Sequence, residues 1–159
     1  MINKSRSNRR IKNLLYRDEL TGLDNLNRFY DSARELLRTG AAGHYAVLYC
    51  DIDRFKLIND TFGFEEGDEV LCTLGRILQQ SVQEQECCAR ISADNFVMLA
   101  DYRQWDILTA RLERIHAELN QWSRVEAAGP HNSSGGSGGN GLRFSATMKY
   151  PVSVSALVE

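Results

Sequence analysis

The feature of this sequence that most restricts its fold is a pair of apolar segments that are best buried in a β-sheet. Residues 45–52, YAVLYCDI, form a continuous apolar run that ends in an acid, which is typical of a strand buried on both faces. Residues 87–99, CCARISADNFVML, place apolar runs on both sides of a short polar turn. They predict a β-hairpin that carries Asp94 and Asn95 at its tip.

Several stretches around these strands predict helices, because apolar residues recur in them every three or four positions. Within the stretch 67–82, Asp68 and Glu69 fall in the first turn, where the helix dipole favours anions. The stretch 53–63 predicts a helical turn or short helix that Gly63 ends. The predicted helices span residues 5–16, 27–37, 53–63, 67–82 and 104–122.

The order of these elements is helix, helix, strand, helix, strand, strand, helix, strand, since residues 142–158 are rich in strand-forming types. This order favours an α/β or α+β sandwich with helices covering a sheet. We divide the chain into a basic N-terminal helix or linker at residues 1–16 and one domain at 17–159. Residues 129–141 predict a flexible Gly/Ser loop, whose composition fits a designed linker as well as a natural low-complexity loop.

Composition narrows the class of protein. A chain of 159 residues with 43% hydrophobic content suits one domain with a real core. A formal net charge of −2 gives no general case for nucleic acid or an anionic membrane as partner. The basic segment 3–12 fits a solvated helix end or linker, and also a phosphate- or lipid-binding arm. The sequence shows no signal peptide or membrane span, and four cysteines without a CxxC spacing predict reduced thiols, so we expect a cytoplasmic protein.

Two acids bracket the end of the first predicted strand. Asp51 and Asp53 flank Ile52, and side chains at i and i+2 share one face of a strand. A carboxylate next to a free backbone carbonyl offers the oxygen ligands that a hard divalent cation prefers. In the alternative interpretation, an aspartate at this position caps the following helix.

Longer motifs decide between these interpretations. Residues 51–71, DIDRFKLINDTFGFEEGDEVL, resemble the signature of the GGDEF family, the diguanylate cyclase domains, D-I-D-x-F-K-x-I-N-D-x-x-G-H-x-x-G-D-x-x-L. Residues 17–25, RDELTGLDN, are similar to the family's D-x-L-T-G-L-x-N opening, and SADNF at 92–96 stands where the family has G-G-D/E-E-F. Three ordered motifs at the family's spacing identify the chain as a degenerate member. The resemblance covers roughly residues 16–122.

The resemblance implies a fold like the palm of class III nucleotide cyclases. This is a βαββαβ core with a central antiparallel sheet flanked by helices, of which we expect the C-terminal part to be truncated here. In active members two protomers face each other, each holding GTP with Mg²⁺ or Mn²⁺. Attack of each 3′-hydroxyl on the opposite α-phosphate gives cyclic di-GMP and pyrophosphate.

The resemblance also implies a role for particular residues. Asp51, the carbonyl of Ile52 and Asp94 would be metal ligands, which suits two-metal chemistry because the carboxylates come from separate chain segments. Asp94 and Lys56 would be the catalytic residues, in an impaired site. The alternative for Asp94 is a solvent-exposed turn residue chosen for its backbone tolerance.

The implied nucleotide site lies just after the D-I-D motif. Phe55 and Lys56 would be nucleotide-binding residues, and Lys56 would contact phosphate together with nearby backbone amides. Asn59 and Asp68 would read the guanine edge by hydrogen bonding. The alternatives are a helix-end amide for Asn59 and an N-terminal helix cap for Asp68.

The tip departs from the family pattern. Ser92 and Ala93 replace two glycines, which permit positive φ and close approach of phosphate to the backbone. Asn95 replaces a glutamate and can neither act as a base nor neutralise a metal. We therefore expect a loss of turnover of roughly 10³-fold or more.

Other departures lie outside the tip. Phe64 stands where the family has histidine, and Leu26 replaces an arginine. QEQE at residues 83–86 occupies the position of the family's product-binding R-x-x-D motif.

The first hypothesis for function is a degenerate GGDEF domain of cyclic di-GMP signalling that binds GTP or dimerises as a regulatory module. An EAL phosphodiesterase or sensor domain in cis and a homodimer are its expected partners, with no nucleic acid or membrane bound by this segment. The alternatives are an active diguanylate cyclase and a purely structural protein-interaction domain.

Overall fold

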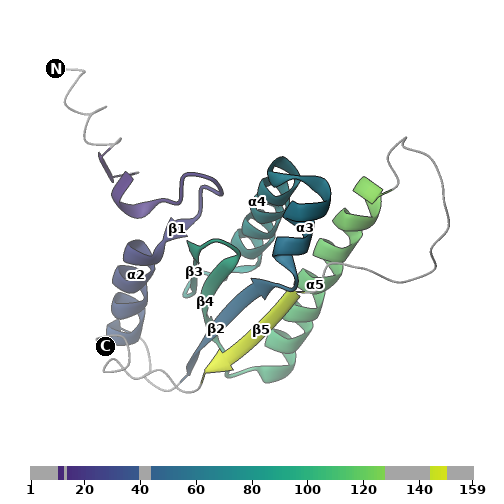
Figure 1. The fold of residues 1–159 in the computed structure, drawn as a ribbon. Helices are drawn as coiled ribbons and strands as arrows, with labels where there is room; N and C mark the ends of the chain where they lie inside the picture. The colour runs from purple at the N-terminus through teal and green to yellow at the C-terminus, as the bar shows by residue number, and fades with distance from the viewer. Residues whose placement is uncertain (1–10, 13, 40–43, 128–143, 150–159) are drawn as a thin grey trace.

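The computed structural model describes residues 11–12, 14–39, 44–127 and 144–149 (Figure 1). A sheet with strand order β1–β3–β4–β2–β5 forms its centre. β2 pairs antiparallel with both β4 and β5, and β3 pairs antiparallel with β4. The strands are β1 (Asp24–Asn25), β2 (Tyr45–Ile52), β3 (Cys87–Ser92), β4 (Asn95–Asp101) and β5 (Phe144–Lys149).

Helices cover both faces of this sheet. Along the chain β2 is followed by two helices, then by β3 and β4, then by one helix and β5, so the predicted βαββαβ core with an antiparallel sheet is confirmed. α2 lies on one side of the sheet and α4 and α5 on the other (Figure 1). The helices are α2 (Leu26–Thr39), α3 (Phe55–Phe62), α4 (Phe64–Ser81) and α5 (Trp105–Ala127).

The period-two alternation of β2 divides its side chains between two cores. Leu48, Cys50 and Ile52 join the core under α4 and α5, and each is almost fully buried. Tyr45 and Val47 face the other way and pack in the core under α2. Because fully burying one large aliphatic side chain contributes about 1.5–3 kcal/mol, both faces hold the strand in register.

The second half of β2 is buried on one face alone, so the expectation of a strand buried on both faces is wrong there. Tyr49 is 44% exposed, and Asp51 is also exposed. The core under α2 takes in Tyr45 and Val47 from this strand and does not extend to Tyr49 or Asp51. The carboxyl end of the strand therefore presents an open face.

A single glycine separates α3 from α4. Gly63 has a φ of 96°, which favours glycine, and its N–H donates to the carbonyl of Asn59 as α3 ends. α4 begins at the next residue and not near 67, so its first turn carries Glu65 and Glu66. The expectation of Asp68 in the first turn, and its alternative role as a helix cap, are therefore wrong.

The capping alternative for the D-I-D acids is also wrong. The N-cap of α3 is Arg54, and no side chain caps this helix by a hydrogen bond.

The predicted hairpin is confirmed, with Ala93 and Asp94 between its strands. α5 continues to Ala127, beyond the predicted end. The predictions for residues 1–10, 129–141 and 150–159 lie outside the described residues, and no helix of the described part is long and apolar enough to cross a bilayer.

A buried ion pair ties the loop between α4 and β3 to α5. The Glu86 carboxylate accepts hydrogen bonds from Arg111 Nη1 at 2.7 Å and Nη2 at 2.9 Å, and the two side chains are 2% and 8% exposed respectively. The same carboxylate accepts the backbone N–H groups of Gln83 and Asp101, both at 2.9 Å. Four donors on one carboxylate compensate its burial and fix this loop to β4 as well as to α5.

Replacing Arg111 with methionine should lower the free energy of unfolding by about 3–5 kcal/mol, because the Glu86 carboxylate then stays buried without its cation. Urea denaturation measures the loss. Arg114→Met is the matched control, since Arg114 lies three residues further along α5 and its pair with Glu118 is exposed. Equal losses in the two variants would contradict the role of the buried pair.

Candidate functional site

The predicted metal-binding acids lie at the same end of the sheet. The β2–β4 ladder ends with the pair Cys50 and Phe96. Asp51 follows Cys50 directly, and Asp94 lies in the hairpin turn two residues before Phe96. The antiparallel register therefore brings together two carboxylates that are far apart in the sequence.

The electrostatics of Asp51 are consistent with an interaction between these acids. Although the residue is exposed, partial burial of its carboxylate raises the pKa of Asp51, and the negative charges of Asp53 and Asp94 raise it further. Like charges that converge in this way favour either a proton or a bound cation. The carboxylates of Asp51, Asp53 and Asp94 thus concentrate negative charge near the end of β2.

The donors present fit a hard divalent cation better than a soft one. The predicted set consists of two carboxylates, from Asp51 and Asp94, and the carbonyl of Ile52, all of them oxygen donors. Among the described residues, no group of three or more His, Cys, Asp or Glu side chains is arranged to hold a metal ion. A cation here would therefore also depend on oxygens from a bound ligand or water.

The backbone between β2 and α3 turns through a left-handed residue. Arg54 has φ 59° and ψ 33°, and α3 begins directly after it at Phe55. The first N–H groups of a helix have no acceptor within the helix. A left-handed residue before them can turn successive N–H groups toward one point, which forms a concave backbone nest that binds anions. Phe55 packs partly against the core, while Lys56 is exposed at the same place.

Asn59 and Asp68, the two residues predicted to read a base, lie on α3 and α4, and these two helices pack together. The Asn59 side chain lies against Gly67, the neighbour of Asp68. Its Oδ1 is buried and has no hydrogen-bond partner. Asp68 is exposed in the second turn of α4. The structure thus places the Asn59 carboxamide against the residue that precedes Asp68 in α4.

The hairpin tip is held by an arginine that sequence reasoning missed. Arg90 donates from Nε and Nη2 to the carbonyl of Ala93 at 2.8 and 2.7 Å. Its Nη1 donates to both oxygens of Asp18, at 3.2 and 3.1 Å. Asp18 also accepts the N–H and hydroxyl of Thr21. This clamp connects the 17–25 motif to the carbonyl that precedes Asp94.

The clamp depends on an ionised Asp18. Burial by itself would raise the pKa of this carboxyl group, but the hydrogen bonds from Thr21 and Arg90 outweigh it, so the pKa lies below its usual value. The sequence contained a signal for Asp18, because this residue stands at the first position of the D-x-L-T-G-L-x-N motif. Arg90 precedes the tip by two residues in a strand, and only the folded hairpin turns it back onto Ala93.

A partly exposed thiol belongs to the same region. Cys72 lies one turn after Asp68 on α4, and its Sγ donates to the carbonyl of Leu20 at 3.3 Å. Burial raises the pKa of Cys72, and the charge of Asp68 raises it further while Arg90 lowers it. The charges of both Asp68 and the Arg90 clamp therefore act on Cys72.

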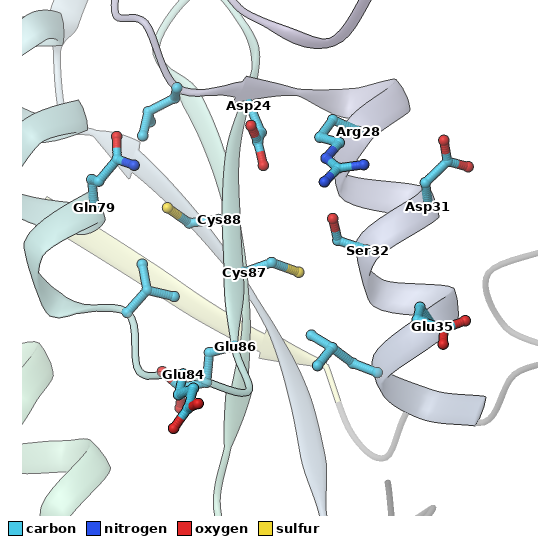
Figure 2. A pocket seen from close by; sticks show the side chains of 13 residues that line it. Asp24, Arg28, Asp31, Ser32, Glu35, Gln79, Glu84, Glu86, Cys87 and Cys88 are labelled. Carbon is cyan, nitrogen blue, oxygen red and sulfur yellow. The ribbon is translucent and has the colours of Figure 1, made fainter. Parts of the chain in front are cut away.

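A separate cavity of about 500 Å³ lies at the outer edge of β3, between α2 and the end of α4 (Figure 2). None of the predicted site residues lines it. β1 pairs only with Ala89 and Arg90, so the edge of β3 beside Cys87 and Cys88 is open here. Its lining includes more acids than bases, among them Glu84 and Glu86 (Figure 2). This charge disfavours an anionic ligand in the cavity.

The sequence profile of the family described as "Diguanylate cyclase, GGDEF domain" matches residues 15–138. The chain belongs to the GGDEF domain family. It is 27% identical over 147 residues to "Probable diguanylate cyclase DgcT" of Escherichia coli, a match that covers 92% of this chain and 29% of DgcT. It is 31% identical over 119 residues to "Bifunctional diguanylate cyclase/cyclic di-GMP phosphodiesterase MucR" of Pseudomonas aeruginosa, covering 74% of this chain and 17% of MucR.

A solved GGDEF structure supports the same fold. The coiled coil and GGDEF domain of DgcB from Caulobacter crescentus, in complex with c-di-GMP, aligns with a TM-score of 0.71 at 20% identity. The alignment covers 99% of this chain and 82% of that one. This GGDEF chain spans less than a third of DgcT or MucR, so both relatives contain further sequence.

The GGDEF tip of this chain is strained at one residue. Ala93 has a φ of 47°, a left-handed conformation that disfavours a side chain with a Cβ. A turn of two residues between strands commonly requires positive φ at its first position. The Arg90 clamp on the Ala93 carbonyl helps hold this conformation without glycine.

Replacing Ala93 with glycine should raise the free energy of unfolding by about 1 kcal/mol, because glycine adopts this φ without a steric penalty. Ser92→Gly is the matched control. Ser92 ends β3 without a positive φ, so glycine should lower stability there by roughly 0.5–1 kcal/mol. Urea denaturation of both variants measures the difference, and a shift of the same sign in both would contradict the strain at Ala93.

Proposed function

We propose that this GGDEF domain binds GTP with Mg²⁺ or Mn²⁺ and acts as a regulatory module of cyclic di-GMP signalling with little or no cyclase activity. The observation that carries the proposal is that the register of β2 and β4 brings Asp51 and Asp94 to the same end of the sheet. Burial raises the pKa of Asp51, and repulsion from Asp53 and Asp94 raises it further. A bound cation relieves this repulsion, and the triphosphate of a nucleotide supplies the further oxygens that the cation needs.

Each part of a nucleotide has a group of this chain beside it. Lys56 and the first N–H groups of α3 would bind phosphate next to the acids. Asn59 and Asp68 would bind the base, since their amide and carboxylate offer a hydrogen-bond donor and two acceptors. When bound, the metal ions supply charge neutralisation and a lower pKa for the attacking hydroxyl.

The tip supports low turnover. The side chains at Ser92 and Ala93 occupy space that two glycines would leave to phosphate, and Ala93 also carries backbone strain. Asn95 is exposed beside Asp94 and is neutral. Removing one preorganised charged or hydrogen-bonding group commonly costs about 10²–10³ in rate, so the combined changes would leave a slow enzyme at best.

An active cyclase is the second candidate, because Asp51, Lys56 and Asp94 are all present at the expected positions. It predicts cyclic di-GMP from GTP and Mn²⁺ with the complete native protein. A purely structural domain is the third candidate, and it predicts no response of the melting temperature to nucleotide.

The partners of the whole protein follow from its relatives. MucR is named as a bifunctional cyclase and phosphodiesterase, and the DgcB structure pairs a coiled coil with its GGDEF domain. We infer a homodimer, with a phosphodiesterase (EAL) or sensor domain in cis. The free thiols of all four cysteines support a cytoplasmic location.

Asp51→Asn should raise the melting temperature of the ligand-free chain at pH 7. A raised pKa means that the fold favours the protonated form, so ionised Asp51 destabilises the fold, and this penalty disappears as pH falls below the folded pKa. The same change should abolish the rise in melting temperature that Mg²⁺ with GTP causes in the native chain.

Thermal melts at several pH values, with and without nucleotide, measure both effects. Asp31→Asn on α2 is the matched control, because Asp31 lies away from the acids at the end of β2. Full retention of the GTP effect in Asp51→Asn would rule out the proposed metal site.

Mg²⁺ with GTP should also slow the alkylation of Cys72 by a maleimide, because a base held by Asp68 covers the next turn of α4. Mass spectrometry of the labelled protein measures the rate at mildly alkaline pH, where the raised pKa still allows reaction. Cys50, Cys87 and Cys88 are buried and serve as internal controls. Unchanged labelling at saturating GTP would show that the base binds elsewhere.

A further inference from the structure

Gly67 lies inside a helix, where glycine is normally unfavourable. It lies in the first turns of α4 and is buried. Glycine inside a helix lowers stability by roughly 0.5–1 kcal/mol relative to alanine. No positive φ explains it, since the described glycines with positive φ are Gly22 and Gly63.

The reason lies in the packing of α3 on α4. A Cβ built on Gly67 would stand 1.8 Å from Asn59 Oδ1, 3.0 Å from Asn59 Cγ and 3.3 Å from Phe55 Cζ. The first distance is far below any real contact. The Asn59 carboxamide therefore occupies the space that any other residue at 67 would fill.

This contact sets the direction of the carboxamide. Its Oδ1 is buried against α4 without a hydrogen-bond partner, which by itself is unfavourable. Because the amide group is planar, its NH₂ points away from Gly67 when Oδ1 points toward it. Asn59 then offers a donor on the side away from Gly67, and the next residue in the chain, Asp68, is exposed and carries an acceptor-only carboxylate.

We propose that Gly67 is a positioning residue that selects the base of the nucleotide by fixing the orientation of Asn59; this inference rests on the proposed function. The NH₂ of Asn59 and the carboxylate of Asp68 suit a purine whose edge carries a hydrogen-bond acceptor beside N–H donors. Guanine has this pattern, with O6 next to N1–H and N2–H₂, whereas adenine offers a single exocyclic donor there. A Cβ at 67 would displace the carboxamide and remove the donor.

The test compares the native chain with Gly67→Ala in calorimetric titrations with GTP, ATP and inorganic tripolyphosphate, each with Mg²⁺. Gly67→Ala should bind GTP about tenfold more weakly, the equivalent of one hydrogen bond. Its affinity for tripolyphosphate should stay unchanged, because that probe uses only the phosphate and metal groups. Its preference for GTP over ATP should therefore fall.

Melting temperatures separate positioning from simple destabilisation. Gly67→Ala should melt below the native chain, but in the Asn59→Ala background the same change should cost much less, because the clashing Oδ1 is gone and only the approach to Phe55 Cζ at 3.3 Å remains. Equal losses of GTP and tripolyphosphate affinity in Gly67→Ala, or an unchanged GTP affinity, would overturn the inference.

Titrations of the native chain distinguish a failure of the base-selection role from a failure of the proposed function. Binding of tripolyphosphate without binding of GTP would overturn the base-selection role and leave the metal and phosphate site standing. Binding of neither would overturn the proposed function.

Discussion

The antiparallel pairing of β2 with β4 is the constraint on which the rest of the site depends. It runs from Tyr45 opposite Asp101 to Cys50 opposite Phe96, so the end of β2 meets the turn of the hairpin. A shift by one residue would exchange the two faces of β2 and bury Asp51 in the core of Ile52. Core packing on both sides of β2 therefore also sets the place of the acids.

A second level of organisation comes from segments that fix the groups around those acids. The 17–25 motif holds Arg90 through Asp18, and Arg90 in turn holds the carbonyl of Ala93. At the opposite end of β3, the Glu86–Arg111 pair ties the preceding loop to α5. The hairpin is thus fastened at both ends of β3, and this explains how its tip keeps a two-residue turn although no glycine is present.

The residues that depart from the GGDEF pattern lie partly at the hairpin tip and partly elsewhere, at Leu26, Phe64 and positions 83–86. Ser92, Ala93 and Asn95 change the tip, whereas the core of β2 and β4 is apolar throughout. At positions 83–86 the departure has a structural role, because the Glu86 carboxylate forms a buried ion pair with Arg111. The residues that hold the sheet are therefore largely distinct from the residues at the tip.

The sequence by itself determined the parts of this protein that local pattern controls. Apolar runs and periodicity predicted β2, the hairpin and the helices, and the quoted motifs predicted the family, the fold and the acids Asp51 and Asp94. The start of α4 was missed because the conformation of Gly63, and not a capping side chain, begins that helix.

Tertiary structure alone decided the contacts between residues that are distant in the chain. Arg90 meets Asp18 across 72 positions, Asn59 meets Gly67 through the packing of two helices, and the exposure of Tyr49 depends on how far the core under α2 extends. Periodicity reports which face of an element is buried, but it carries no information on which neighbour covers it. The geometry of the site therefore follows from packing, although the chemical groups in it could be read from the chain.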